Sequence, residues 1–212
     1  MNLGVLVSGS GSNLQAILDA VDGQALRNAR VAVVLSNRAD AFALTRAQRA
    51  GVPSAVLQHG DYSSRREYDA QMLACLRRHD VDTVALAGFM RIVGKEFLAA
   101  FPGRVLNIHP SLLPACPGLH APRQALEYGV KVTGATVHLV DAGVDSGPIV
   151  CQESVPVYPD DDETSLKERI QAVEHRLYPA ALQLLAKGEL RTDGRRVGSG
   201  VPFPEGAGGA PA

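Results

Sequence analysis

The stretch LGVLVSGSGSNLQAILDAV, residues 3–21, decides the fold. Residues 3–8 are an apolar run bounded by glycine, which is typical of a β-strand that is covered on both faces. A glycine loop follows, and apolar residues then return at helical spacing, at Leu14, Ile17, Leu18 and Val21. A buried strand that leads through a glycine loop into a helix is the opening unit of an α/β sheet.

The same alternation continues downstream. It predicts further strands over 30–36, 53–58, 83–89 and 104–109, with helices over 39–51, 63–80 and 95–101. Strands that alternate with helices are joined by right-handed crossovers, so we expect a mostly parallel twisted sheet with helices on both faces.

The alternation of strands and helices ends after residue 130. Two longer strands, over 134–140 and 147–157, have only a loop between them, which predicts an antiparallel addition in the C-terminal half. The last helix is expected over 164–188, interrupted at Pro179. We expect one domain over residues 1–194, with halves at about 1–102 and 103–194. Residues 195–212 are rich in Gly, Pro and Ala and predict a disordered tail.

Composition excludes several classes of protein. The 212 residues are 46% hydrophobic and 20% charged with a formal net charge of -1, which indicates a globular protein without a field that attracts nucleic acid or anionic membranes. No apolar run is long enough for a transmembrane helix, and residues 1–3 do not begin a signal peptide. Cys75, Cys116 and Cys151 lack metal-like spacing, so we expect three free thiols in a reducing cytoplasm.

The glycine loop is a candidate anion site. Gly9 and Gly11 allow close approach to backbone N–H groups at a helix N-terminus, and Ser12 and Asn13 add polar side chains. Leu14 takes the place of the third glycine of a dinucleotide motif, and no acidic residue is placed for a ribose, so a phosphomonoester fits better than a dinucleotide. The alternative is a plain strand-to-helix turn.

VLNIHPSLLP, residues 105–114, presents two polar side chains at the end of a strand. Asn107 and His109 lie two residues apart and therefore point to the same face. Asn107 can stabilise an oxyanion, and His109 can transfer a proton near neutral pH. The prolines that follow stiffen the exit of the strand. The alternative for His109 is a structural histidine that caps the strand end.

An active imidazole usually has an orienting carboxylate. The segment VDAGVDSGPIV, residues 140–150, offers Asp141 and Asp145, and spacing alone does not choose between them. Both could equally be turn-forming residues. Gln171 and Glu174 share a face of the last helix, where Glu174 could bind an amine or belong to a surface stripe. His120 could reach the site from the proline loop, whereas the alternation around His138 favours a packing role.

These motifs together resemble the phosphoribosylglycinamide formyltransferases, folate-dependent enzymes of purine synthesis. The resemblance runs through about residues 1–190, on VLVSGSGSNLQAI, LAGFMRI, LNIHPSLLP, PGLHAPRQALE and the later GPI and EH..YP segments. The segment LNIHPSLLP is shared with other formyl-folate transferases, including methionyl-tRNA formyltransferase, and so identifies the chemistry. The loop SGSGSNLQ and the short chain point to the glycinamide ribonucleotide enzyme.

The resemblance implies a role for each matching residue. His109 is the general acid, Asn107 binds and polarises the formyl group, and Asp145 pairs with His109. The backbone of Gly11, Ser12 and Asn13 binds the ribonucleotide phosphate, and Gln171 and Glu174 face the glycinamide end. The folate site is lined by Arg65, Met90, Arg91, Ile92, Val93, Asn107 and the loop from Asp141 to Asp145. Cys116 departs from the pattern, because the family usually has an aromatic residue there.

The reaction that the resemblance implies is transfer of the formyl group of 10-formyltetrahydrofolate to the amine of glycinamide ribonucleotide, on the route to IMP. It requires no metal and no covalent enzyme intermediate. We expect a cytoplasmic monomer or homodimer whose nucleotide-binding half precedes a folate-binding and catalytic half. The rival hypotheses are a formyl-folate hydrolase, a non-catalytic nucleotide or folate binding module, and a dinucleotide reductase.

Overall fold

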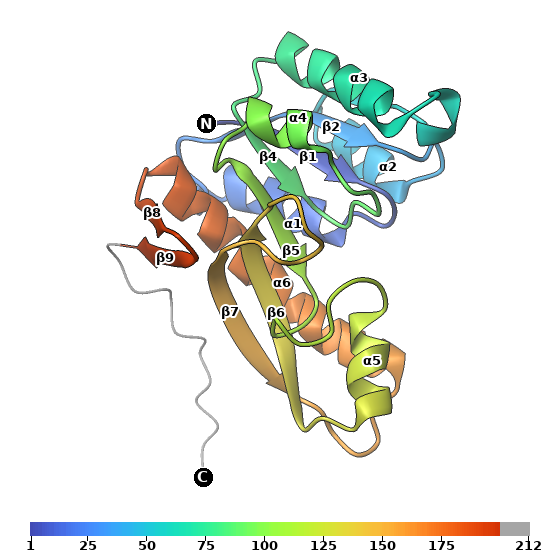
Figure 1. Ribbon diagram of the computed structural model, residues 1–212, viewed down its shortest axis with the longest axis vertical. Helices are drawn as coiled ribbons and strands as arrows, with labels where there is room; N and C mark the ends of the chain where they lie inside the picture. The colour runs from blue at the N-terminus through green and yellow to red at the C-terminus, as the bar shows by residue number, and fades with distance from the viewer. Residues whose placement is uncertain (200–212) are drawn as a thin grey trace.

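A seven-stranded sheet, in the order β3-β2-β1-β4-β5-β6-β7, forms the centre of the computed structural model, which describes residues 1–199 (Figure 1). Its strands are β1 (Asn2–Val7), β2 (Arg30–Ser36), β3 (Ser54–Val56), β4 (Thr83–Leu86), β5 (Val105–His109), β6 (Val132–Leu139) and β7 (Ile149–Pro156). The helices are α1 (Ser12–Asp22), α2 (Phe42–Arg49), α3 (Arg65–Arg78), α4 (Lys95–Ala100), α5 (Ala121–Tyr128) and α6 (Glu163–Ala186), with a 3-10 turn at His59–Asp61. The mostly parallel α/β fold is therefore confirmed.

The first five strands pair in parallel, and β6 and β7 add in antiparallel fashion as predicted. In Figure 1, β6, β7 and α5 extend away from the part of the molecule that holds β1 to β4. Strand β5 lies between a parallel neighbour, β4, and an antiparallel neighbour, β6. Strand β5 is therefore the boundary between the parallel part of the sheet and the antiparallel addition.

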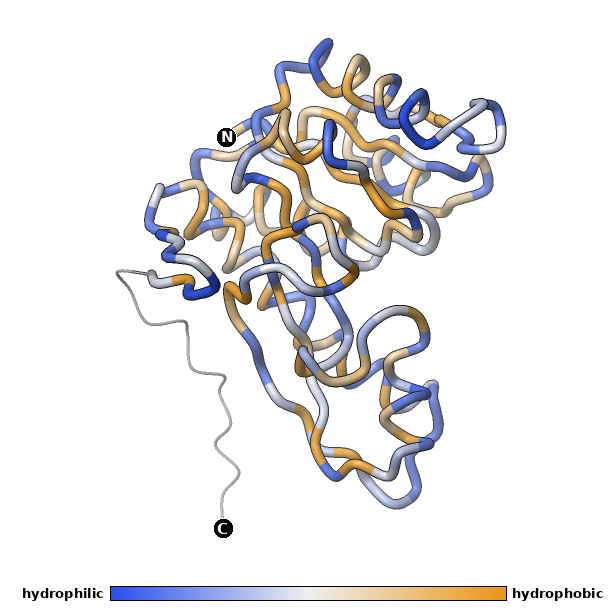
Figure 2. Tube along the Cα trace, viewed as in Figure 1, coloured by the Kyte–Doolittle hydropathy of each residue, from blue (hydrophilic) through white to orange (hydrophobic). Residues whose placement is uncertain are grey.

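Two apolar clusters cover the two faces of the sheet. One joins the strands to α1, α2, α5 and α6, and the other joins them to α3 and α4. Figure 2 shows the corresponding apolar strands inside and polar segments outside. The strands read as nearly continuous apolar runs because both of their faces are buried, as expected for parallel strands between helices.

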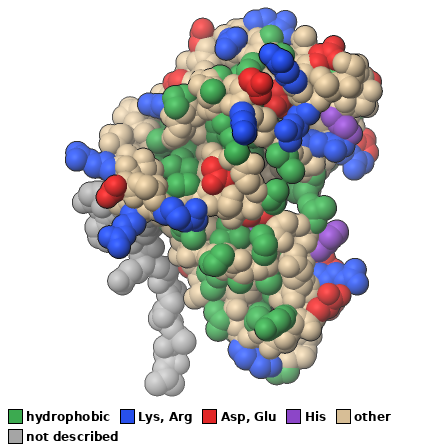
Figure 3. All heavy atoms as spheres, viewed as in Figure 1, with side chains coloured by type: hydrophobic (Ala, Val, Ile, Leu, Met, Phe, Trp, Pro, Cys, Tyr) green, Lys and Arg blue, Asp and Glu red, His purple; other side chains and the backbone are tan. Residues whose placement is uncertain are grey.

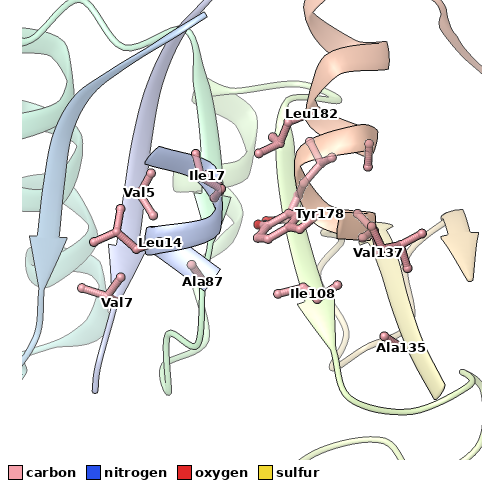
Figure 4. Packing of buried hydrophobic residues seen from close by; sticks show 14 of the residues in the cluster. Val5, Val7, Leu14, Ile17, Ala87, Ile108, Ala135, Val137, Tyr178 and Leu182 are labelled. Atoms are coloured by element: carbon pink, nitrogen blue, oxygen red, sulfur yellow. The ribbon is translucent and has the colours of Figure 1, made fainter. Parts of the chain in front are cut away.

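Helix α6 corrects one expectation. It runs without a break from Glu163 to Ala186 with Pro179 inside it, so the predicted interruption is wrong. Proline removes one intrahelical hydrogen bond. Pro179 is buried beside Tyr178, which is fully buried, and packing of this face against the sheet compensates for that loss (Figure 4).

Two further elements were not predicted. Helix α5 has a proline in its first turn and Gly129 at φ 80° after its end. It buries only the small residues Ala121, Pro122 and Ala125, so its apolar signal is weak. A hairpin of β8 (Leu190–Asp193) and β9 (Arg196–Ser199) follows α6. The expectation of disorder is therefore wrong for residues 196–199, where cross-strand pairing overrides composition. For residues 200–212 the expectation lies outside the described residues.

Within residues 1–199, no helix has the length and apolar character needed to cross a membrane.

Candidate active site

A cleft of about 690 Å³ opens at the carboxyl ends of β4 and β5, where ligands bind in open α/β sheets. Its walls come from α3, the segment after β4, the proline loop after β5, and the loop between β6 and β7. Figure 3 shows the surface hollowed between the two parts of the molecule, with apolar side chains beside the hollow. The volume is in the range of sites that enclose a small organic molecule.

The residues assigned to the folate site by resemblance lie together along this cleft. Arg65, Asn107, Asp141 and the four residues 90–93 all line it. The segment 90–93 is anchored at both ends, because Met90 N donates to Ser8 Oγ (2.8 Å) and Gly94 N donates to Asp69 Oδ2 (2.7 Å). Apolar walls with two guanidinium groups suit a flat heterocycle that carries carboxylates.

The glycine loop lies at the N-terminus of α1, apart from the cleft lining. Gly11 has φ 71° and precedes the first turn, and no side chain caps the helix there. A Cβ on Gly11 would lie 2.6 Å from the Cβ of Ala43, so α2 packs directly against the loop. The uncapped N–H groups of Ser12 and Asn13 and the positive end of the helix dipole favour an anion.

Asn13 and Glu174 connect this loop to α6. Asn13 Nδ2 donates to Glu174 Oε2 over 2.9 Å, and both side chains are buried. Burial raises the pKa of the Glu174 carboxyl. Asn13 Oδ1 is buried without a partner among the described residues, so this atom could accept a hydrogen bond from a ligand. Gln171 lies one turn earlier on α6 and is half-buried.

His109 is buried and has hydrogen-bond acceptors beside both ring nitrogens. Nε2 lies 2.8 Å from the carbonyl oxygen of Cys116, and Nδ1 lies 3.4 Å from Asp145 Oδ2. An imidazole that carries two protons can donate to both acceptors. Cys116 contacts His109 through its backbone carbonyl, which is present whatever the residue at this position.

The sequence left Asp141 and Asp145 open as the partner of His109, and the structure places Asp145 beside it. Asp145 also accepts from Gly118 N over 2.7 Å. Burial by itself raises the pKa of the Asp145 carboxyl, but His138, Gly118 N–H and His109 together hold the pKa below its ordinary value. Asp141 instead accepts hydrogen bonds from Ser146 Oγ and Gly143 N, which shape the loop.

The loop after β5 is held by the sheet as well as by its prolines. Thr136 Oγ1 donates to Ser111 O (2.7 Å) and accepts from Leu113 N (3.1 Å), and Gln152 Nε2 donates to Leu113 O (2.8 Å). In the loop between β6 and β7, Ser146 O accepts from Arg195 of the C-terminal hairpin over 2.9 Å. Residues far apart in the sequence therefore fix both loops around His109.

His138 is a site residue that sequence reasoning missed. The alternation around it favoured a packing role, but its ring lies 3.1 Å from Asn107 Nδ2 and 3.6 Å from Asp145 Oδ1, and it lines the cleft. Finding it requires the antiparallel register that sets Asn107 opposite His138. Residues 1–199 contain no group of three or more His, Cys, Asp or Glu placed to hold a metal ion.

Comparison with known proteins gives a consistent set of relatives. The family model described as formyl transferase matches residues 1–182. The trifunctional purine biosynthetic protein adenosine-3 of Drosophila melanogaster is 50% identical over 185 residues, which are 87% of this chain and 14% of that protein. The phosphoribosylglycinamide formyltransferase of Mycobacterium tuberculosis is 49% identical over 199 residues, 91% of each chain.

The fold has a close match among solved structures. The crystal structure of glycinamide ribonucleotide transformylase 1 from Symbiobacterium toebii has a TM-score of 0.92 and 55% sequence identity, over 94% of this chain and 93% of that one. The chain therefore spans a small part of the trifunctional relative and nearly all of the other two.

Proposed function

The chain belongs to the formyl transferase family, and we propose that it transfers the formyl group of 10-formyltetrahydrofolate to the amine of glycinamide ribonucleotide in de novo purine biosynthesis. The products are N-formylglycinamide ribonucleotide and tetrahydrofolate. The observation that carries the proposal is the meeting of Asn107, His109 and Asp145 at one end of a cleft that has the size and lining for a folate.

The chemistry follows from these three side chains. The amine attacks the formyl carbon, and negative charge develops on the former carbonyl oxygen. The Asn107 amide stabilises that charge by donating a hydrogen bond, and a protonated His109 adds a positive charge beside it. Asp145 holds His109 in orientation and stabilises its charged form. The proton lost by the amine reaches the departing folate nitrogen with His109 as the general acid.

The two substrates enter from different sides of this centre. The folate lies along the cleft, with its carboxylates near Arg65 and Arg91. The ribonucleotide phosphate binds the N–H groups of Ser12 and Asn13, and Gln171 and Glu174 face the glycinamide end. The Asn13–Glu174 hydrogen bond supports this assignment, because it joins the phosphate loop to α6.

The chain is proposed to act as one domain over residues 1–194, with a nucleotide-binding half at about 1–102 and a folate-binding half at about 103–194. One core cluster has members from Leu3 to Leu182, so it contains residues of both halves, which supports a single domain. We place the enzyme in the cytoplasm as a monomer or homodimer, in keeping with its three free cysteines.

A transformylation assay with each substrate omitted in turn tests the function. Product is expected only when both substrates are present. Formate release without the ribonucleotide would favour a hydrolase, and binding of both substrates without turnover would favour a binding module. His109→Ala should lower kcat by about 10²- to 10⁴-fold, the usual contribution of a general acid. Near-wild-type turnover in a folded His109→Ala variant would contradict the role of His109.

A further inference from the structure

Two histidines flank Asp145, and their hydrogen-bond partners differ. His109 has an acceptor beside each nitrogen, the carbonyl of Cys116 and the carboxylate of Asp145. His138 has an acceptor beside Nδ1 only, the carbonyl of Leu139 at 2.9 Å. Beside its Nε2, at 3.1 Å, lies Nδ2 of Asn107, which is a donor.

This arrangement selects one form of His138. A neutral imidazole has one N–H donor and one acceptor nitrogen, and the bond made by one nitrogen fixes the role of the other. Nδ1–H donates to Leu139 O, so Nε2 carries the lone pair and accepts a hydrogen from Asn107. Asp145 Oδ1 lies 3.6 Å from Nε2, farther than Asn107 Nδ2, and could accept from Nε2 only if His138 carried a second proton.

We propose that neutral His138 is a positioning residue, which sets the orientation of the Asn107 amide for formyl transfer. One hydrogen of Asn107 Nδ2 is bound to His138, and the other remains free for an oxygen in the cleft that Asn107 lines. Oδ1 then points the other way, where it can accept from an attacking amine. Without an acceptor at residue 138, the amide can rotate and present its oxygen to the developing oxyanion.

The strand pairing around His138 places it beside Asn107 and next to a shift in register. Strands β5 and β6 set Asn107 directly opposite His138. The pairing of β6 with β7 shifts register between Val137 and His138, with Val137 opposite Cys151 and His138 opposite Ile149. Such bulges re-aim a side chain and occur often beside active sites. The His138 ring is 2% exposed, so its surroundings hold it in one orientation.

The inference rests on the proposed function, and kinetics of matched variants test it. His138→Leu removes the acceptor at similar volume, whereas His138→Gln keeps an acceptor oxygen. We expect His138→Leu to lower kcat at least 30-fold, since the amide acts on the transition state, with KM for both substrates changed less than about threefold. His138→Gln should recover at least a third of the loss on a logarithmic scale.

The controls separate positioning from folding. His79→Leu, immediately after α3, should leave kcat within twofold of the wild type. A His138→Leu variant that folds and keeps its kcat would overturn the proposal, as would equal loss in His138→Gln and His138→Leu. If the wild type itself lacks transformylation, the proposed function fails instead.

A measurement on the unmodified protein remains decisive if the leucine variant does not fold. Nitrogen-15 NMR of histidine-labelled protein at pH 7.5 should show His138 with its proton on Nδ1 and a lone pair on Nε2. A proton on Nε2, alone or together with one on Nδ1, would leave no lone pair there to accept from Asn107, and would overturn the proposal.

Discussion

At the scale of single residues, the candidate site buries two carboxyl groups whose pKa values depend on their surroundings. Glu174 is buried against Asn13, and burial raises the pKa of its carboxyl. Asp145 is also largely buried, but its neighbours hold the pKa of its carboxyl low. The surroundings therefore shift the pKa values of these two carboxyl groups in opposite directions. Perturbed groups of this kind gather at functional sites.

Glu174→Gln is predicted to raise the stability of the protein and to lower its affinity for the ribonucleotide. Since the pKa of Glu174 is raised in the folded state, its charge destabilises the fold above that pKa, and this cost disappears as the pH falls through it. A glutamine oxygen can still accept from Asn13. At pH 8 we expect Tm to rise by about 2–4 °C, equivalent to roughly 1 kcal/mol for a chain of this size.

The gain from Glu174→Gln should shrink toward pH 4.5, where the wild-type carboxyl is protonated. Ribonucleotide affinity should fall at least tenfold. Differential scanning calorimetry across pH and titration with the ribonucleotide measure both effects. Glu168→Gln, at an exposed position of the same helix, should change neither. A lower Tm for Glu174→Gln at pH 8 would contradict the prediction.

At the scale of elements, the strand-to-helix turns could be predicted because their signals are local. The apolar run, the glycines and the helical spacing all lie within residues 3–21, and β1 and α1 form there. Helix α5 and the hairpin β8–β9 lack such signals. Small buried residues stabilise α5, and strand pairing stabilises the hairpin. Elements that depend on tertiary contacts rather than local pattern were the ones missed.

Gly11→Val is predicted to damage the glycine loop, which we propose binds the ribonucleotide phosphate. A Cβ at residue 11 would lie 2.6 Å from the Ala43 Cβ and 2.8 Å from the Ala43 Cα, so the loop must move away from α2. We expect ribonucleotide affinity to fall at least tenfold and folate affinity to stay within twofold. Calorimetric titration with each ligand measures this. An equal loss for both ligands would count against a phosphate site at this loop.

Gly51→Val is a matched control for backbone strain. Gly51 has φ 66°, similar to the 71° of Gly11, but a Cβ there meets nothing within 4 Å. Both variants should therefore lose stability from the left-handed backbone, about 1–2 kcal/mol. Only the variant at Gly11 should also lose ribonucleotide affinity.

At the scale of the whole molecule, α6 connects both halves of the chain to the site. It packs against α1 and the sheet, carries Glu174 toward the glycine loop, and inserts Tyr178 among the strands (Figure 4). The Tyr178 hydroxyl lies 3.1 Å from Leu86 O and 2.9 Å from Leu106 O, and so bridges β4 and β5 below the cleft. The same helix thus stabilises the fold and completes the site.

Tyr178→Phe is predicted to destabilise the protein by about 1–3 kcal/mol, because two buried carbonyl oxygens lose their shared donor. The ring still fills the core, so no cavity forms. Chemical denaturation measures the change in the free energy of unfolding. Tyr128→Phe is the matched control, since Tyr128 is 87% exposed and should alter stability by less than about 0.5 kcal/mol. An unchanged stability for Tyr178→Phe would show that the bridge contributes nothing.

The sequence by itself determined the α/β class, the antiparallel addition, the glycine loop and the pairing of Asn107 with His109 on one face. Each of these depends on the spacing of residues within a short segment. Only the tertiary structure brought Asp145 beside His109, set His138 against Asn107 and buried Glu174 beside Asn13. Those contacts depend on strand register and helix packing between distant segments, which no local pattern of residues specifies.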